Sequence, residues 1–110
     1  MGLMTALTVV VANTTSLNVC AGQKEEFIKE PSVVTLSATG SAAGLLATLI
    51  IGEEVVLDDQ VIPPTNRFPI VPDDSLVQGG AFEGDRVVCR LRNATGGNLN
   101  GYTRIDIEPA

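Results

Sequence analysis

Two stretches near the carboxyl end decide the fold class: RVVCRLR at Arg86–Arg92 and GYTRIDIE at Gly101–Glu108. In the first stretch Val87, Cys89 and Leu91 share one side, and polar residues occupy most of the other. The second stretch alternates in the same way. Successive side chains of a strand point to opposite faces, so this period of two predicts two half-buried β-strands.

The segments before these two predict further strands. Ser32–Thr39 (SVVTLSAT) alternates in part, and Leu45–Ile51 (LLATLII) is separated from Glu54–Leu57 by the pair Gly-Glu. Two apolar runs around a two-residue turn are typical of a β-hairpin. A helix over Ala42–Ile51, with the following glycine as its cap, is the main competing interpretation.

The amino-terminal part is less regular. Leu3–Ala12 (LMTALTVVVA) predicts a strand that is buried on both faces or lies against a neighbouring subunit. Leu17–Ala21 predicts a second short strand. Gln23–Glu30 (QKEEFIKE) has helical character but is too short for a stable helix, so it predicts one helical turn or an ordered loop.

Four prolines interrupt Asp58–Pro72, which predicts an irregular segment or an edge strand, because proline cannot donate a hydrogen bond to a sheet. Phe68 and Ile70 are expected to anchor this segment to the core. The following residues up to Gly80 look loop-rich, apart from Leu76-Val77. The sum is about seven to eight short strands in one domain, residues 1–110, as an all-β antiparallel sandwich or a jelly-roll-like barrel.

The composition excludes several classes of function. The net charge is −6 and the seven Lys and Arg residues do not cluster, so neither nucleic acid nor an anionic membrane is an expected partner. The chain has no histidine, which removes Ser-His-Asp and Cys-His catalysis. We therefore expect a protein that is not an enzyme, with no catalytic residue and no cofactor.

Cysteines and acidic pairs are the remaining chemical candidates. Cys20 and Cys89 predict either two buried free thiols or a disulfide between two strands. Three acidic pairs are interpreted as solvated turn residues, and no metal site is expected. The alternative is a Ca²⁺ site built from Asp58, Asp59, Asp73 and Asp74.

The amino-terminal run is too short to span a membrane and lacks the basic region of a signal peptide, so a cytoplasmic origin is expected. Aromatic residues are scarce, with Tyr102 the single tyrosine and no tryptophan. Sugar-binding clefts usually carry such platforms, so the scarcity argues against a glycosidase or a carbohydrate-binding module.

The second half resembles small structural proteins of tailed-bacteriophage virions. The residues that carry the likeness are NRFPIVPDDSLVQGGAFEGDRVVCRLRN (Asn66–Asn93) and GYTRIDIEP (Gly101–Pro109). In these residues an apolar, proline-rich segment leads into a Gly-Asp turn and a strand with arginines on one face, and a polar loop and a closing strand follow. Capsid decoration, or cement, proteins and some head or tail spike modules look like this. The resemblance implies a β-sandwich that forms a homotrimer, binds the major capsid protein on the capsid surface and stabilises the head.

On this interpretation the run Leu3–Val11 is a candidate contact arm that adds a strand to a neighbour's edge, the alternative being an internal core strand. The candidate partner contacts are Leu7, Val9, Val11, Arg86, Arg90 and Arg92. For the arginines the alternative is a solvated sheet face. Two other functions stay open: a non-viral oligomeric adhesive or assembly module, and a small ligand- or carbohydrate-binding domain.

Overall fold

The computed structural model describes residues 2–23, 26–69 and 75–109. These residues form seven strands and no helix, and the predicted all-β antiparallel sandwich is confirmed. The strands are β1 (Gly2–Val10), β2 (Ser32–Gly40), β3 (Leu45–Ile51), β4 (Glu54–Val61), β5 (Ser75–Ala81), β6 (Val87–Asn93) and β7 (Leu99–Pro109). The helical alternative over residues 42–51 is wrong, because β3 and β4 form the predicted hairpin.

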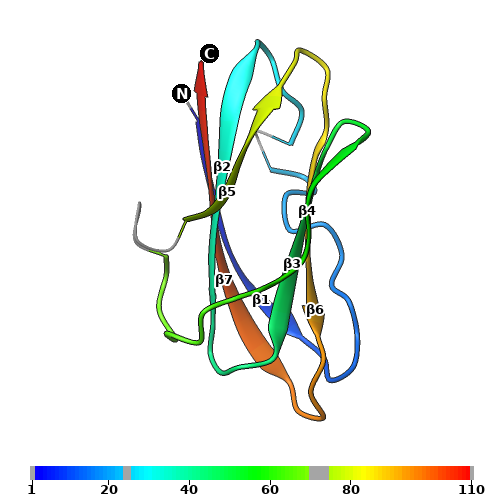
Figure 1. Ribbon diagram of the computed structural model, residues 1–110, viewed down its shortest axis with the longest axis vertical. Helices are drawn as coiled ribbons and strands as arrows, with labels where there is room; N and C mark the ends of the chain where they lie inside the picture. The colour runs from blue at the N-terminus through cyan, green and yellow to red at the C-terminus, as the bar shows by residue number, and fades with distance from the viewer. Residues whose placement is uncertain (1, 24–25, 70–74, 110) are drawn as a thin grey trace.

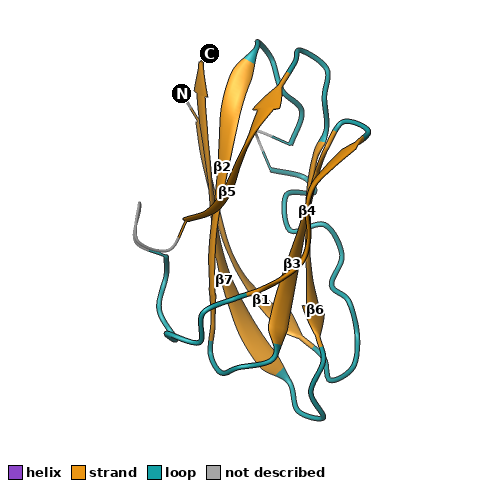
Figure 2. Ribbon diagram, viewed as in Figure 1, coloured by secondary structure: helices purple, strands orange, loops and turns teal. Residues whose placement is uncertain are grey.

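The strands form two sheets that face one another (Figures 1 and 2). One sheet has the order β1-β7-β2-β5 and the other has the order β4-β3-β6, with every pair antiparallel. We call them the four-stranded and the three-stranded sheet. The first and last strands pair with each other, Gly2 opposite Ile107, so the two ends of the chain lie side by side.

The core between the sheets is aliphatic. The side chains that alternate inward from β6 and β2, such as Leu91 and Leu36, are fully buried. Burying a leucine or valine side chain stabilises the fold by roughly 1.5–3 kcal/mol, so these positions supply most of the driving force. The largest fully buried apolar side chains are Leu36, Leu45, Leu49, Ile62, Leu91, Ile105, Val10, Val34 and Val87.

Strand β5 corrects the prediction of a loop through Gly79-Gly80. This strand pairs with β2, and Gly79 lies opposite Val34. A Cβ atom at Gly79 would lie 3.0 Å from Val56 Cγ1 and 3.1 Å from Ile51 Cδ1. The glycine therefore marks a place where β5 comes close to the other sheet, and it does not mark a turn.

The prediction that Phe68 anchors the core is also wrong. Its side chain is 49% exposed and packs edge-on against Tyr102, with 5.1 Å between the ring centroids. Ile62 and Pro69 are the buried residues of this segment. Ile70, the second predicted anchor, lies outside the described residues. Ile62 therefore anchors the start of this segment in the core, whereas Asn66 and Phe68 contact Tyr102 on the outer surface of the four-stranded sheet.

Candidate interaction surface

The sandwich has four sheet edges, formed by β1 and β5 in one sheet and by β4 and β6 in the other. An edge strand presents unpaired N–H and C=O groups on its outer side. Soluble proteins cover such an edge, shorten it, bend it with a bulge, or charge it, because it can otherwise pair with another chain. The four edges of this protein are treated in different ways.

The β6 edge is covered by the chain between β1 and β2. The Ser16 amide donates to the Leu91 carbonyl at 2.7 Å, and the Val19 amide donates to the Cys89 carbonyl at 2.8 Å. Isolated bridges join Thr15 to Arg92 and Phe27 to Arg86. The predicted strand over Leu17–Ala21 is therefore wrong, although this segment does occupy the position of a strand beside β6.

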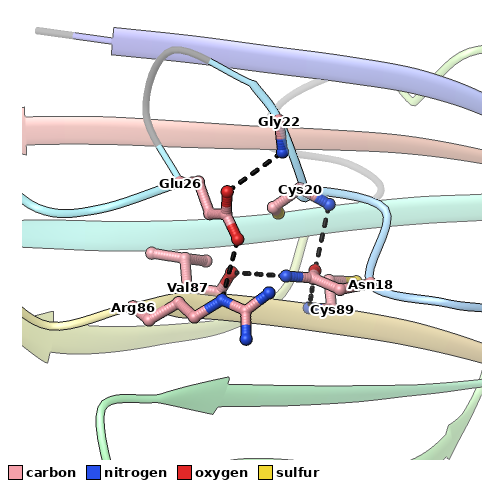
Figure 3. Close-up of polar contacts among 7 residues, drawn as sticks. All are labelled: Asn18, Cys20, Gly22, Glu26, Arg86, Val87 and Cys89. Carbon is pink, nitrogen blue, oxygen red and sulfur yellow. Dashed lines mark hydrogen bonds and ion pairs between the residues drawn. The ribbon is translucent and has the colours of Figure 1, made fainter.

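Asn18 explains why this covering segment pairs with β6 without becoming a strand (Figure 3). Its side-chain Oδ1 accepts from the amides of Cys20 and Cys89, at 3.0 and 2.9 Å, and its Nδ2 donates to the Val87 carbonyl at 3.2 Å. One side chain thus satisfies three backbone groups. An asparagine commonly replaces backbone partners in this way.

An ion pair fixes the far end of the covering segment. Arg86 Nε lies 2.7 Å from Glu26 Oε2, while Glu26 Oε1 accepts from the Gly22 amide at 3.0 Å. The Gly22 amide and then the Arg86 guanidinium lower the pKa of the Glu26 carboxyl below its usual value. Arg86, a predicted partner contact, is therefore engaged within the chain (Figure 3).

The β4 and β5 edges are irregular. Strand β4 carries Asp58 and Asp59, its pairing with β3 shifts register twice, and Asp59 has a φ of 48°. Strand β5 contains two glycines, and its pairing with β2 shifts after Leu36. The two strands also approach each other at the side of the sandwich. Charge, bulges and mutual cover therefore block both edges.

Strand β1 has none of these features. It pairs with β7 in an unbroken register over nine residues and contains no proline and no charged side chain. Within the described part of the chain, no strand pairs with its other side. Every second residue of β1 therefore directs its N–H and C=O groups outward without a strand partner.

An apolar stripe runs along the outer face of this open edge. Leu3, Leu7, Val9 and Val11 are 55%, 56%, 62% and 55% exposed. The alternate residues Met4 and Val10 are buried in the core. The predicted contacts Leu7, Val9 and Val11 thus lie together, and Leu3 extends their line. We call these four side chains the β1 stripe.

The predicted arginine contacts do not join the β1 stripe, because β6 belongs to the other sheet. Arg92 Nε lies 3.2 Å from Asp59 Oδ1, so Arg92, like Arg86, has an internal partner. Arg90 is exposed and makes no salt bridge to any described residue. Of the three arginines, Arg90 is the one whose charge is most available to another molecule.

Two hollows lie on the outer surface of the four-stranded sheet, on either side of Arg104. Their volumes are about 250 and 220 Å³, and the first is lined by Thr5, Phe68, Pro69 and Arg104. Ligand pockets usually enclose roughly 300–1,000 Å³. Phe68, which lines the first hollow, packs against Tyr102, and the Tyr102 hydroxyl donates a hydrogen bond to Asn66 Oδ1 at 3.1 Å. Neither hollow has the size expected of a small-molecule site.

The two cysteines are buried free thiols. Burial raises the pKa of the Cys20 thiol to about 12, and complete burial raises the pKa of Cys89 still further. A thiol that stays protonated is a poor nucleophile. Neither residue therefore has the environment of a catalytic cysteine.

Acidic residues do not form a metal centre in the part of the chain that the structure describes, where no three carboxylates or thiols lie close enough together to bind an ion. Asp73 and Asp74, half of the predicted alternative Ca²⁺ site, lie outside the described residues.

No helix among the described residues is long and apolar enough to cross a membrane. Neither a protein-family model nor a curated protein sequence matches this chain.

Proposed function

We propose that this protein is a structural assembly module, and that its assembly is the head of a tailed bacteriophage, where it decorates the shell and binds the major capsid protein. The β1 stripe on an open strand edge carries the assembly part of the proposal, and the resemblance of residues Asn66–Asn93 and Gly101–Pro109 to virion proteins supports the phage part. The β1 edge offers an uncharged strand for pairing and four aliphatic side chains for packing. Strand addition of this kind is a recurring mode of protein recognition.

The chemistry of the remaining surface supports an assembly role over a catalytic one. The two thiols are buried, and no carboxylate cluster forms among residues 2–23, 26–69 and 75–109. All three phenylalanines are about half exposed or more, while the core is aliphatic. Aromatic side chains on a surface are typical of protein contacts. Phe27 and Phe82 therefore add to the contact surface that a shell could use.

The phage-specific part of the proposal is tested with empty head shells assembled from the major capsid protein of the same genome. The purified chain is mixed with the shells, and bound protein is measured by co-sedimentation over a range of concentrations. We expect saturable binding at a fixed ratio to the capsid protein, and a shell that disassembles at a higher temperature. Absence of binding at concentrations that saturate self-association would remove the phage role.

A non-viral assembly or adhesion module is the second candidate. The observation in its favour is that the β1 stripe contains only aliphatic side chains, which can pack against an apolar surface on many kinds of protein. The same experiment separates the two candidates. Self-association without shell binding removes the decoration role and favours the second candidate, whereas saturable shell binding favours the decoration role.

A further inference from the structure

We infer that the β1 edge binds the β1 edge of a second copy, antiparallel, so that two four-stranded sheets become one eight-stranded sheet. The inference rests on the proposed assembly function and names the partner of its surface. A pair of identical edges related by a twofold axis is a closed dimer. It therefore differs from the homotrimer that the resemblance to decoration proteins implies.

The first argument is the contrast among the four edges. The β6 edge is covered by its own chain, and the β4 and β5 edges are bent by register shifts. Only β1, among the described strands, combines a long regular edge with an uncharged face. Because an open, regular edge is a template for pairing with another chain, β1 is the edge at which a second copy can add a strand.

The second argument is self-complementarity. The antiparallel register that overlaps the whole of β1 sets Ala6 opposite Ala6 of the second copy. Leu3 then faces Val9, and Thr5 faces Leu7. Three side chains of the β1 stripe, Leu3, Leu7 and Val9, would thus meet apolar or hydroxyl partners across the new junction, and the inward and outward faces of both sheets would remain continuous.

The third argument is charge. The chain carries a net charge of −6, so two copies repel one another over most of their surfaces. Strand β1 has no charge, and the nearest charges on β7 neutralise each other, since Arg104 Nε lies 3.1 Å from Asp106 Oδ2. Arg104 and Asp106 lie opposite Thr5 and Leu3. A second copy can therefore approach this edge without like-charge repulsion at the contact.

The buried area sets the expected strength. Leu3, Leu7 and Val9 are each just over half exposed, and each would contact one neighbouring strand while staying on the outer face of the sheet, so the junction buries only part of their exposed area. A standard interface buries roughly 800 Å² per partner. We therefore expect a weak dimer in dilute solution. Copies held together on a shell would pair more completely, because their effective concentration is higher.

Sedimentation velocity and native mass spectrometry over roughly 1 µM to 1 mM test the inference. We expect a monomer–dimer equilibrium for the unmodified chain. The variant Leu7→Lys should stay monomeric over the whole range, because the two lysines would be diagonal neighbours across the junction and repel one another, and a lysine on an edge strand opposes strand pairing. Val55→Lys is the matched control, since Val55 is an edge-strand residue of β4 with 55% exposure, and it should dimerise like the unmodified chain.

A monomer at every concentration, a trimer, or a dimer that both or neither of the two variants abolish would overturn the inference. If Leu7→Lys does not fold, Thr5→Lys on the same face takes its place. The shell-binding experiment is scored separately. If the protein dimerises but does not bind shells, the pairing of β1 edges is supported and the phage role is contradicted. If it binds shells as a monomer, the phage role is supported and the pairing is contradicted.

Discussion

Strands β6 and β1 both lie at the edge of a sheet, where backbone N–H and C=O groups lack a strand partner on one side, and the described chain covers β6 but not β1. Along β6, residues between β1 and β2 supply the missing partners, with Asn18 bonded to three backbone groups. Along β1, nine residues pair on one side alone. The difference is that, within the described residues, the chain covers β6 and leaves β1 open to pairing with another strand.

Breaking the covered edge should have the largest effect on stability. Asn18→Ala would leave the amides of Cys20 and Cys89 and the Val87 carbonyl without their partner. An unsatisfied buried group costs about 1–3 kcal/mol, so we expect a loss of about 3 kcal/mol in the free energy of unfolding, measured by urea denaturation.

Asn98→Ala is the control for this prediction, since Asn98 Oδ1 accepts one exposed bond, from the Ala12 amide at 3.1 Å. Its loss should stay below about 1 kcal/mol. Equal losses for the two alanine variants would show that the Asn18 network does not hold the covering segment in place.

Breaking the open edge should change association and leave the monomer almost as stable as before. Leu7 is 56% exposed, so Leu7→Lys should alter the monomer's free energy of unfolding by about 0.5 kcal/mol or less. Dimerisation raises the melting temperature as protein concentration increases. Calorimetry at several concentrations should show that dependence for the unmodified chain and none for the variant. A dependence shared by both would place the contact elsewhere.

The thiols report how firmly the covering segment is held. Because burial raises the pKa of Cys20 to about 12, its thiol stays protonated at pH 8 and below, and Cys89 is buried more completely. We expect almost no reaction of the native protein with a disulfide reagent at pH 8, and reaction of both thiols in guanidinium. Asn18→Ala should accelerate the native reaction. Rapid reaction of the unmodified protein would contradict the closed β6 edge.

The ion pair at the end of the covering segment should have the smallest effect. The pKa of Glu26 is lowered in the folded state, so its stabilising contribution is complete above the carboxyl's unfolded pKa. It is lost as the pH falls through the lower folded pKa. Glu26→Gln should therefore be slightly less stable than the unmodified chain at pH 7, and the two should converge in strong acid. A difference that grows on acidification would contradict this assignment.

Local alternation predicted the regular parts of the fold. The inward positions of β6, Val87, Cys89 and Leu91, are all buried, and the β3–β4 hairpin lies where its two-residue turn indicated. The prediction of a loop through Gly79-Gly80 failed for a reason that lies outside the local sequence. Gly79 looked like a turn residue because glycine is common in turns. Its close approach to Val56 depends on how the two sheets pack. Such tertiary context is not visible in a local pattern.

The candidate surface was predicted only in part. The run Leu3–Val11 showed an apolar segment, and the prediction selected Leu7, Val9 and Val11 from it. The sequence could not show that β1 would be an edge strand, because strand order depends on long-range pairing between β1 and β7. Nor could it show that Arg86 and Arg92 would pair with Glu26 and Asp59.

Amide hydrogen exchange, measured residue by residue at low and high protein concentration, tests the claim that β1 is a pairing edge most directly. We predict that every second amide of β1, on the side away from β7, exchanges rapidly in dilute solution and becomes protected at high concentration. Amides of the covered β6 edge should be protected at both concentrations. Protection of β1 that does not depend on concentration, or exchange of its outward amides that stays fast throughout, would contradict the account.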